Sequence, residues 1–352
     1  MSENDMSENR VTRDGLRGER PGRDATFGNG MAGVDGSPRR DGGRGKRRRR
    51  GEELAVPPAD FTSYYGRPVI KAPAWAPADI AGYLFLGGLA GAGSVLAAGA
   101  AATGRPATAR AMKVSSLGAL TLSTAALVHD LGRPGRFAHM LRVIKPTSPM
   151  SVGSWLLAAY GPLAGAAAVS DLTGLLPRAG SAATRGAALL GPGVATYTGV
   201  LLADTAVPAW HEAHRTMPFL FAASAAAAAS GMALATGPVA ENGPARRAAV
   251  LGAAAELALT RALHRGAGLA GETYGRGAAG RLLGAAKALG WAGAAGAALL
   301  GRHRAPAALS GAALLAASAC TRFGVFTAGI ASARDPRYTI APQRERLSGG
   351  AG

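Results

Sequence analysis

Residues 127–136 carry the side chains most able to do chemistry in this sequence. An apolar run ends there in His129 and Asp130, and Arg133 follows in a loop that contains Gly and Pro. Ionisable groups at the end of a hydrophobic segment are expensive to desolvate, and by default they mark an ion, proton or ligand site. A carboxylic acid beside a solvent-exposed loop can exchange protons with a two-electron, two-proton carrier such as a quinol. The alternative is an interfacial ion pair of Asp130 with Arg133 or Arg136, and the two interpretations are compatible.

A second pair of candidate residues belongs to the fourth apolar segment. Tyr197 lies inside that segment, and a buried phenol needs a hydrogen-bond partner. A quinone carbonyl is one such partner, and a neighbouring backbone carbonyl is another. Asp204 follows seven residues later, which is two turns along the same helical face. We therefore expect the phenol and the carboxylate to lie on one face of the helix, with Asp204 nearer the membrane surface at which Asp130 lies.

Two further charges, Glu256 and Arg322, fall inside apolar segments. A charge at the middle of a bilayer costs at least about 2.5–3.5 kcal/mol, and pairing with an opposite charge would make both residues tolerable. A structural bridge between the two is the favoured interpretation, and proton transfer is the second.

Metal and haem chemistry are not expected in this chain. His211 and His214 have the i, i+3 spacing of some helical metal ligands, yet such a polar cluster beside a Trp is more often an interfacial loop. The single Cys320 cannot hold an iron–sulfur cluster, a tetrahedral zinc ion or an intrachain disulfide. His129 and His211 lie at segment ends rather than in facing positions at mid-membrane, which argues against haem.

The elements that must position these groups are apolar segments. The chain is 48% hydrophobic and 17% charged, and several windows of Ala, Gly, Leu and Val reach the roughly 20 residues that cross a bilayer as a helix. The sequence predicts an all-α, polytopic membrane protein with about eight transmembrane helices in two four-helix bundles. The predicted spans are 80–102, 110–129, 151–170, 187–206, 216–236, 246–264, 282–300 and 306–330.

The net charge of +18 comes mostly from the loops. Residues 1–56 hold 13 Lys and Arg against 10 Asp and Glu and few large apolar side chains, so we expect a disordered basic tail. Basic loops beside apolar spans record insertion orientation and contact with anionic lipid, which we favour over nucleic-acid binding. Their bias predicts a multi-pass protein of the cell membrane with both termini in the cytoplasm. A pre-membrane strap at 57–79, a membrane domain at 80–332 and a C-terminal tail at 333–352 complete the division.

Basic residues gather in the loop after the second span and in the strap before the first. Only apolar residues separate most of them, so this surface could dock a protein or bind lipid head groups. The candidate docking residues are Arg133, Arg136, Arg142 and Lys145 in the loop, with Arg67 and Lys71 in the strap.

Small residues in the first span favour close packing between helices. Gly87 and Gly91 are four residues apart, so one face of that helix is nearly bare. Small faces let helix backbones approach within lipid, where the hydrophobic drive between helices is absent. We expect a tightly packed bundle, although a general bias towards Ala and Gly also contributes.

Four stretches together resemble the NrfD/polysulfide reductase membrane-subunit (PsrC-like) family. They are YLFLGGLAG at 83–91, DLGRPGRF at 130–137, KPTSPMS at 145–151 and YTG at 197–199. The second and third are the most specific, and the resemblance covers roughly residues 62–335.

This resemblance implies eight transmembrane helices without haem or metal, and a site for menaquinone or ubiquinone near one membrane surface. It also implies two partners, an iron–sulfur subunit with four [4Fe–4S] clusters and the molybdopterin catalytic subunit that it serves. Tyr197 matches the quinone-contacting tyrosine of the fourth helix, and Asp130 the polar residue that ends the second. His129 would then relay protons and Asp204 would line their route. Trp75 and Asp79 stand where some members carry a polar residue, which makes them candidate quinone contacts.

By this interpretation the chain is a quinone-interacting membrane anchor, and it has no catalytic activity of its own because its only electron carrier is the quinone. Two other functions remain open. A secondary transporter would use Asp130, Asp204 and Glu256 as coupling carboxylates, and it predicts an inverted repeat that is not evident in the sequence. A purely structural anchor would bind no quinone at all.

Overall fold

The computed structural model describes residues 69–73, 75–133 and 135–349, and the regular elements within these ranges are all helical. This confirms the predicted all-α class. The expected basic tail at 1–56 and part of the strap, including Arg67, lie outside the described residues.

Eight long helices in the described part of the chain overlap the eight predicted segments, although the fourth begins ten residues earlier than predicted. They are α2 (Pro77–Ala102), α3 (Pro106–Asp130), α5 (Pro149–Thr173), α6 (Pro177–Ala203), α8 (Met217–Thr236), α9 (Gly243–Gly266), α11 (Gly277–Leu300) and α12 (Arg304–Arg334). Seven of them are long and apolar enough to cross a membrane, and α9 is not among the seven. The chain is therefore a multi-pass membrane protein. An eighth span remains a prediction, because α9 carries Arg246, Arg247, Glu256, Arg261 and Arg265.

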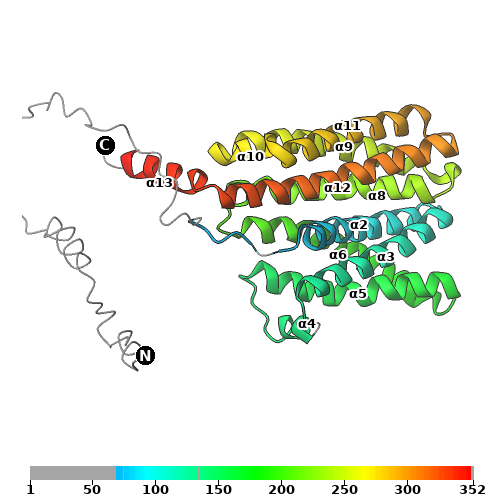
Figure 1. Ribbon diagram of the computed structural model, residues 1–352. Helices are drawn as coiled ribbons and strands as arrows, with labels where there is room; N and C mark the ends of the chain where they lie inside the picture. Colours follow the sequence, from blue (N-terminus) through cyan, green and yellow to red (C-terminus); the bar gives the residue numbers. More distant parts are fainter. Residues whose placement is uncertain (1–68, 74, 134, 350–352) are drawn as a thin grey trace, which may run out of the picture. The chain divides into compact units, whose positions relative to one another are not determined.

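Short helices mark the two ends of this set. At one end, which we call the α4 end, lie α4 (Gly135–Met140), α7 (Pro208–Glu212), α10 (Glu272–Gly275) and α13 (Arg337–Gly349), with the turn η3 (Gly268–Gly271) before α10. The start of α2 and the end of α12 lie at the same end (Figure 1). The turn η2 (Val239–Glu241) joins α8 to α9 at the opposite end, the η2 end.

Proline begins four of the long helices, at Pro77, Pro106, Pro149 and Pro177. The first turn of a helix leaves its N–H groups without intrahelical partners, so a residue that lacks the N–H and has a helical φ fits there. Ser148, the residue before Pro149, makes no side-chain cap bond.

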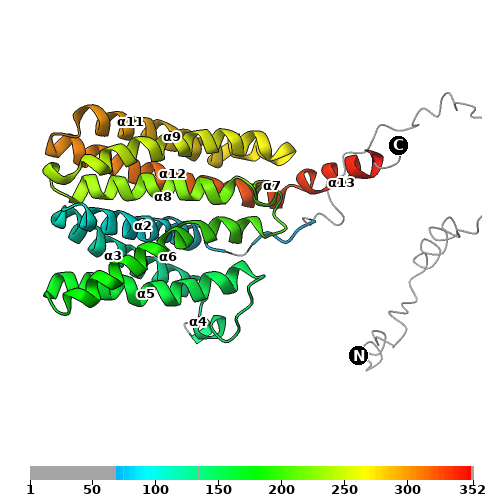
Figure 2. The same cartoon turned by 180° about the vertical axis from the view of Figure 1, so that it is seen from behind.

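Glycine allows the closest helix contacts. Helices α2, α3, α5 and α6 pack as neighbours, and α8, α9, α11 and α12 pack as neighbours on the other side (Figures 1 and 2). A Cβ at Gly91 of α2 would collide with the carbonyl oxygen of Gly191 on α6, and the reverse holds as well. Gly231 of α8 and Gly311 of α12 make the same reciprocal contact. The close backbone approach expected at Gly91 is confirmed.

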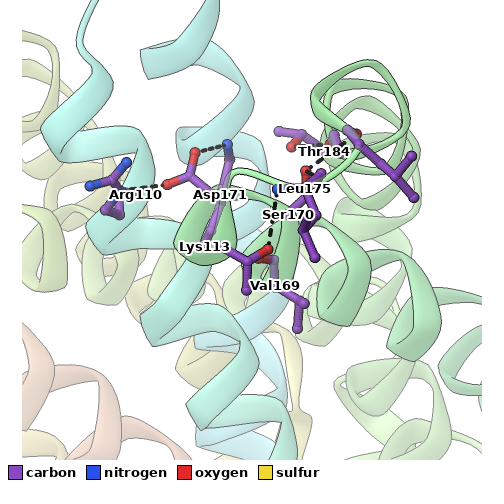
Figure 3. Close-up of polar contacts among 10 residues, drawn as sticks. Arg110, Lys113, Val169, Ser170, Asp171, Leu175 and Thr184 are labelled. Atoms are coloured by element: carbon purple, nitrogen blue, oxygen red, sulfur yellow. Dashed lines mark hydrogen bonds and ion pairs between the residues drawn. The ribbon is translucent and has the colours of Figure 1, made fainter.

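Two carboxylates hold the η2 end together. Glu241 of η2 accepts the backbone N–H of Thr108 at 2.7 Å and that of Ala107 at 3.4 Å, at the start of α3. The Thr108 bond is the main reason that the pKa of Glu241 lies below its usual range. Asp171 of α5 accepts from Arg110 and from Lys113 of α3, each at 2.8 Å (Figure 3).

Candidate functional site

A cavity of about 450 Å³ lies among α2, α3, α5 and α6 at the α4 end. Most of its lining is apolar and includes Leu84, Leu127, Leu157 and Leu202. The side chains that bring polar atoms to it are Trp75, Tyr83, Asp130, Arg136, His139, Ser154 and Tyr197. Tyr197 and Asp130, which come from different helices, therefore meet at one cavity, as the sequence led us to expect.

Two tyrosines form the buried polar part of the cavity. The hydroxyl of Tyr197 on α6 is hydrogen-bonded to the hydroxyl of Tyr83 on α2, and both residues are buried. Gly153 of α5 faces the Tyr197 ring, and a Cβ there would collide with ring atoms Cε2 and Cδ2. Sequence reasoning missed Tyr83 as a site residue. Its position in the YLFLGGLAG stretch was the available signal, since it is a phenol inside an apolar span, like Tyr197.

Asp130 is the last residue of α3 and serves as an anchor as well as a wall of the cavity. Its Oδ1 accepts the backbone N–H of Ala76 at 3.0 Å, just before the first turn of α2. A carboxylate at this position also interacts favourably with the positive end of the α2 dipole. Among the described residues Asp130 forms no ion pair with Arg133 or Arg136, because Arg136 donates instead to the carbonyl of Leu131 at 3.0 Å.

His129 and Asp79 pair with each other beside the cavity. The Nδ1 atom of His129 lies 2.8 Å from Oδ2 of Asp79, and the imidazole is 81% exposed. Neither residue belongs to the cavity lining. The proton relay assigned to His129 and the quinone contact assigned to Asp79 stay predictions.

Trp75 connects the cavity to the second group of helices. It lines the cavity and stacks on Trp210 of α7, with ring centroids 5.9 Å apart and an interplanar angle of 17°. Trp210 is fully buried and donates from Nε1 to the carbonyl of Val325 on α12 at 2.9 Å. Gly329 of α12 leaves the space that the Trp210 indole fills. Trp210 is thus a core residue and not the interfacial anchor suggested by its neighbours in the sequence.

Asp204, like His129 and Asp79, lies outside the cavity lining. Helix α6 ends at Ala203, and Asp204 is exposed and does not belong to the lining of the Tyr197 cavity. A spacing of seven residues aligns two side chains only while both belong to the helix. Here the second residue is the C-cap, whose φ of −85° and ψ of 41° are no longer helical.

The loop between α3 and α5 is held by the start of α5. Ser151 Oγ accepts the backbone N–H of Lys145 at 2.9 Å and donates to the carbonyl of Val143 at 3.0 Å. Trp155 Nε1 donates to the same carbonyl at 3.3 Å. The candidate docking residues that the structure describes are all exposed at the α4 end, namely Lys71, Arg133, Arg136, Arg142 and Lys145.

Glu256 and Arg322 are both buried, but no ion pair joins them in the described structure. Glu256 Oε1 accepts from Thr321 Oγ1 at 2.6 Å. Arg322 donates from Nη2 to the carbonyl of Phe221 at 2.7 Å, and its guanidinium lies 3.7 Å from the centroid of the Phe221 ring. The two charges make no direct contact, because consecutive residues on α12 face different neighbours, yet each is close enough to interact electrostatically with the other.

Comparison with known proteins adds one match. The family model described as polysulphide reductase, NrfD, matches residues 74–252, which is half of the chain. The matched region runs from just before α2 into α9 and contains every residue named above in the lining of the cavity. A search of the curated proteins found no match.

Proposed function

We propose that this chain, which belongs to the polysulphide reductase NrfD family, is the quinone-binding membrane subunit of an oxidoreductase complex. One observation carries the proposal: two hydrogen-bonded phenols and a carboxylate share an apolar cavity of about 450 Å³ near one end of the membrane helices. Sites for small apolar molecules have this composition, with an apolar wall and a few polar groups that orient the ligand.

The tyrosine pair suits the recognition of a carbonyl or hydroxyl oxygen. Each phenol has one O–H, and the bond between Tyr83 and Tyr197 uses only one of the two hydrogens. The second hydrogen is available to a ligand oxygen in the cavity. A quinone supplies the chemistry, since it takes up two electrons and two protons when it is reduced to the quinol.

Asp130 is suited to moving the proton. Its Oδ1 is occupied by the Ala76 N–H, which leaves the second carboxylate oxygen for proton exchange. The residue is only partly buried and is followed directly by the exposed loop, so a proton can pass to water without crossing the helix bundle.

The remaining parts of the proposal rest on family resemblance. They are an iron–sulfur subunit with four [4Fe–4S] clusters, a molybdopterin catalytic subunit, and α9 as an eighth span that completes two four-helix bundles. The exposed basic residues at the α4 end, Lys71, Arg133, Arg142 and Lys145, would then dock the iron–sulfur subunit beside the cavity. With eight spans, both ends of the membrane domain would lie on the same side, and the bias of basic loop residues would place that side in the cytoplasm.

The test uses the full chain and, as a second assay, the purified complex. Tyr197→Phe and Asp130→Asn should each weaken binding of a short-chain naphthoquinol by about tenfold or more, the loss expected for one hydrogen bond to a charged or buried partner. Asn keeps an oxygen for the Ala76 N–H, so this variant should still fold.

Tyr160→Phe is the matched control. Tyr160 is a fully buried tyrosine of α5 whose hydroxyl contacts Ser94 and the carbonyl of Ala90, away from the cavity. It should bind naphthoquinol normally even if its unfolding midpoint falls. Unchanged binding in both site variants, with the subunits still assembled, would favour a purely structural anchor and overturn the proposal.

A further inference from the structure

A second cavity, of about 550 Å³, lies between α9 and α11. Tyr274 and Gly275 of α10 bound it at the α4 end, and Thr321 of α12 contributes to its wall. Apart from Val250, the residues that line it lie beyond the region that matches the NrfD family. Nothing in the proposed quinone chemistry uses this cavity.

One end of the cavity is cationic. Arg261 and Arg265 are four residues apart on α9, so they share one helical face at this end. Lys287 lines the cavity farther in, because it lies ten residues into α11 and so near the level of Glu256. All three side chains are exposed, and none forms an ion pair with any residue that the structure describes. The other end, towards Val250, Trp291 and Ala294, is apolar.

These cations create a physical conflict in a bilayer. Arg261 and Arg265 lie on the face of α9 that borders the cavity, and they are part of the reason that α9 is not apolar enough to count as a span. An unpaired cation at such a position is expensive unless it reaches the headgroup layer or an anion. Basic pockets between membrane helices are known to take anionic lipid head groups, which remove this cost.

We propose that the cavity binds a phospholipid with an anionic head group. Arg261 and Arg265 would hold the phosphate, and one acyl chain would lie along the apolar wall towards Val250 and Trp291. From Arg265 to Val250 the helix rises about 22 Å, which is close to half of the roughly 40–45 Å thickness of a bilayer with its head groups. The cavity therefore fits a lipid of one leaflet.

Glu256 lies deeper in the cavity than the two arginines. It is the one carboxylate in the lining, and the hydroxyl of Thr321 holds it against α12. It lies five positions before Arg261, which is about 7.5 Å along the helix. A phosphate held by Arg261 and Arg265 therefore stays at the α4 end, and only the lipid tail reaches past Glu256.

The test measures retained lipid on the full chain. The protein is reconstituted with equal amounts of phosphatidylcholine and phosphatidylglycerol, extracted into detergent, and examined by native mass spectrometry. The wild-type chain should retain one phosphatidylglycerol in clear preference to phosphatidylcholine. Arg261→Gln with Arg265→Gln should reduce this preference by about tenfold or more, since each surface cation near anionic lipid contributes measurably to binding.

Two further variants make the test specific. Arg281→Gln is the matched control, because Arg281 is also exposed and lies on α11 near the same end but does not line the cavity. Gly284→Leu should fill the cavity and remove the bound lipid while the chain still folds, because a Cβ at Gly284 meets no atom within 4 Å. Tyr197→Phe should leave lipid retention unchanged, which separates this inference from the proposed function.

Three outcomes would overturn the inference. They are no preference for phosphatidylglycerol in the wild-type chain, an equal loss in Arg281→Gln, and lipid retention by a folded Gly284→Leu chain. Retention of a quinone in place of phospholipid, insensitive to the arginine substitutions, would also overturn it.

Discussion

Tyr197 can reach Tyr83 only because residue 153 has no side chain. In Gly153→Ala, the new Cβ would lie 2.5 Å from Cδ2 of the Tyr197 ring and closer still to Cε2. Carbon atoms in contact are about 3.5–4.0 Å apart, so the ring must move by roughly 1 Å or more. A displacement of that size breaks or bends the hydrogen bond to Tyr83 and moves the phenol away from the proposed ligand oxygen.

Two opposing terms set the size of the effect on stability. Forcing one methyl group into a packed site costs about 1–3 kcal/mol, and the lost phenol bond adds about 1 kcal/mol. Replacing Gly by Ala inside a helix stabilises by up to about 1 kcal/mol. We therefore expect Gly153→Ala to be destabilised by about 1–3 kcal/mol, and its quinol affinity to fall by about tenfold.

Gly165→Ala separates these terms. Gly165 belongs to the same helix, and a Cβ there meets no atom within 4 Å, so this variant has the propensity gain without the collision. Thermal unfolding in one detergent and binding of a short-chain naphthoquinol would be measured for both variants. If Gly153→Ala matches Gly165→Ala in unfolding midpoint and in affinity, the Tyr197 ring does not lie against α5, and the described site is wrong.

Glu241→Gln should lower the unfolding midpoint at neutral pH, because the carboxylate accepts backbone N–H groups at the start of α3. Since those bonds depress the folded-state pKa, the stabilisation is complete above the ordinary Glu pKa of about 4.3 and is lost as the pH falls through the lower folded value. The midpoints of variant and wild type should converge in acid, and a gap independent of pH would contradict this. Asp171→Asn should destabilise more than the double change with Lys113→Met, because the single change strands an ammonium that is only 11% exposed; an equally stable pair of variants would refute the role of the bond. Thr321→Val removes a donor to a buried carboxylate and should lower the unfolding midpoint more than Thr327→Val, whose hydroxyl bonds only a carbonyl of its own helix. Equal midpoints for the two threonine variants would refute this last expectation.

The positions of the helices could be predicted because bilayer thickness and proline act locally. Each long helix needs about 20 apolar residues, and runs of that length are visible in the sequence. The helix starts at Pro106 and Pro149 lie within four residues of the predicted 110 and 151, whereas the start at Pro177 lies ten residues before the predicted 187. Whether α9 spans the membrane is harder to predict from the sequence. Its charges lower its hydropathy, yet it packs against α8 and α11.

Contacts between helices could be predicted only for residues that belong to a recognisable short motif. Tyr197 and Asp130 belong to family motifs, and both reach one cavity. Tyr83 was missed because its partner lies 114 residues away. Glu256 interacts electrostatically with Arg322 but bonds directly to Thr321, since neighbouring positions on a helix point about 100° apart and Thr321 faces α9.

Glycine links the fold to the candidate site. Within lipid, burial of apolar side chains gives no drive for helices to associate, so backbone approach at small residues has to replace it. The same lack of a side chain makes room for the aromatic rings of the site, with Gly153 facing Tyr197 and Gly329 facing Trp210. Different glycines have these two roles. Gly91 and Gly191 contact each other's backbone between α2 and α6, whereas Gly153 contacts the cavity residue Tyr197. Substitution at the first pair should therefore disturb assembly of α2 on α6, whereas substitution at Gly153 should disturb the cavity and leave that interface intact.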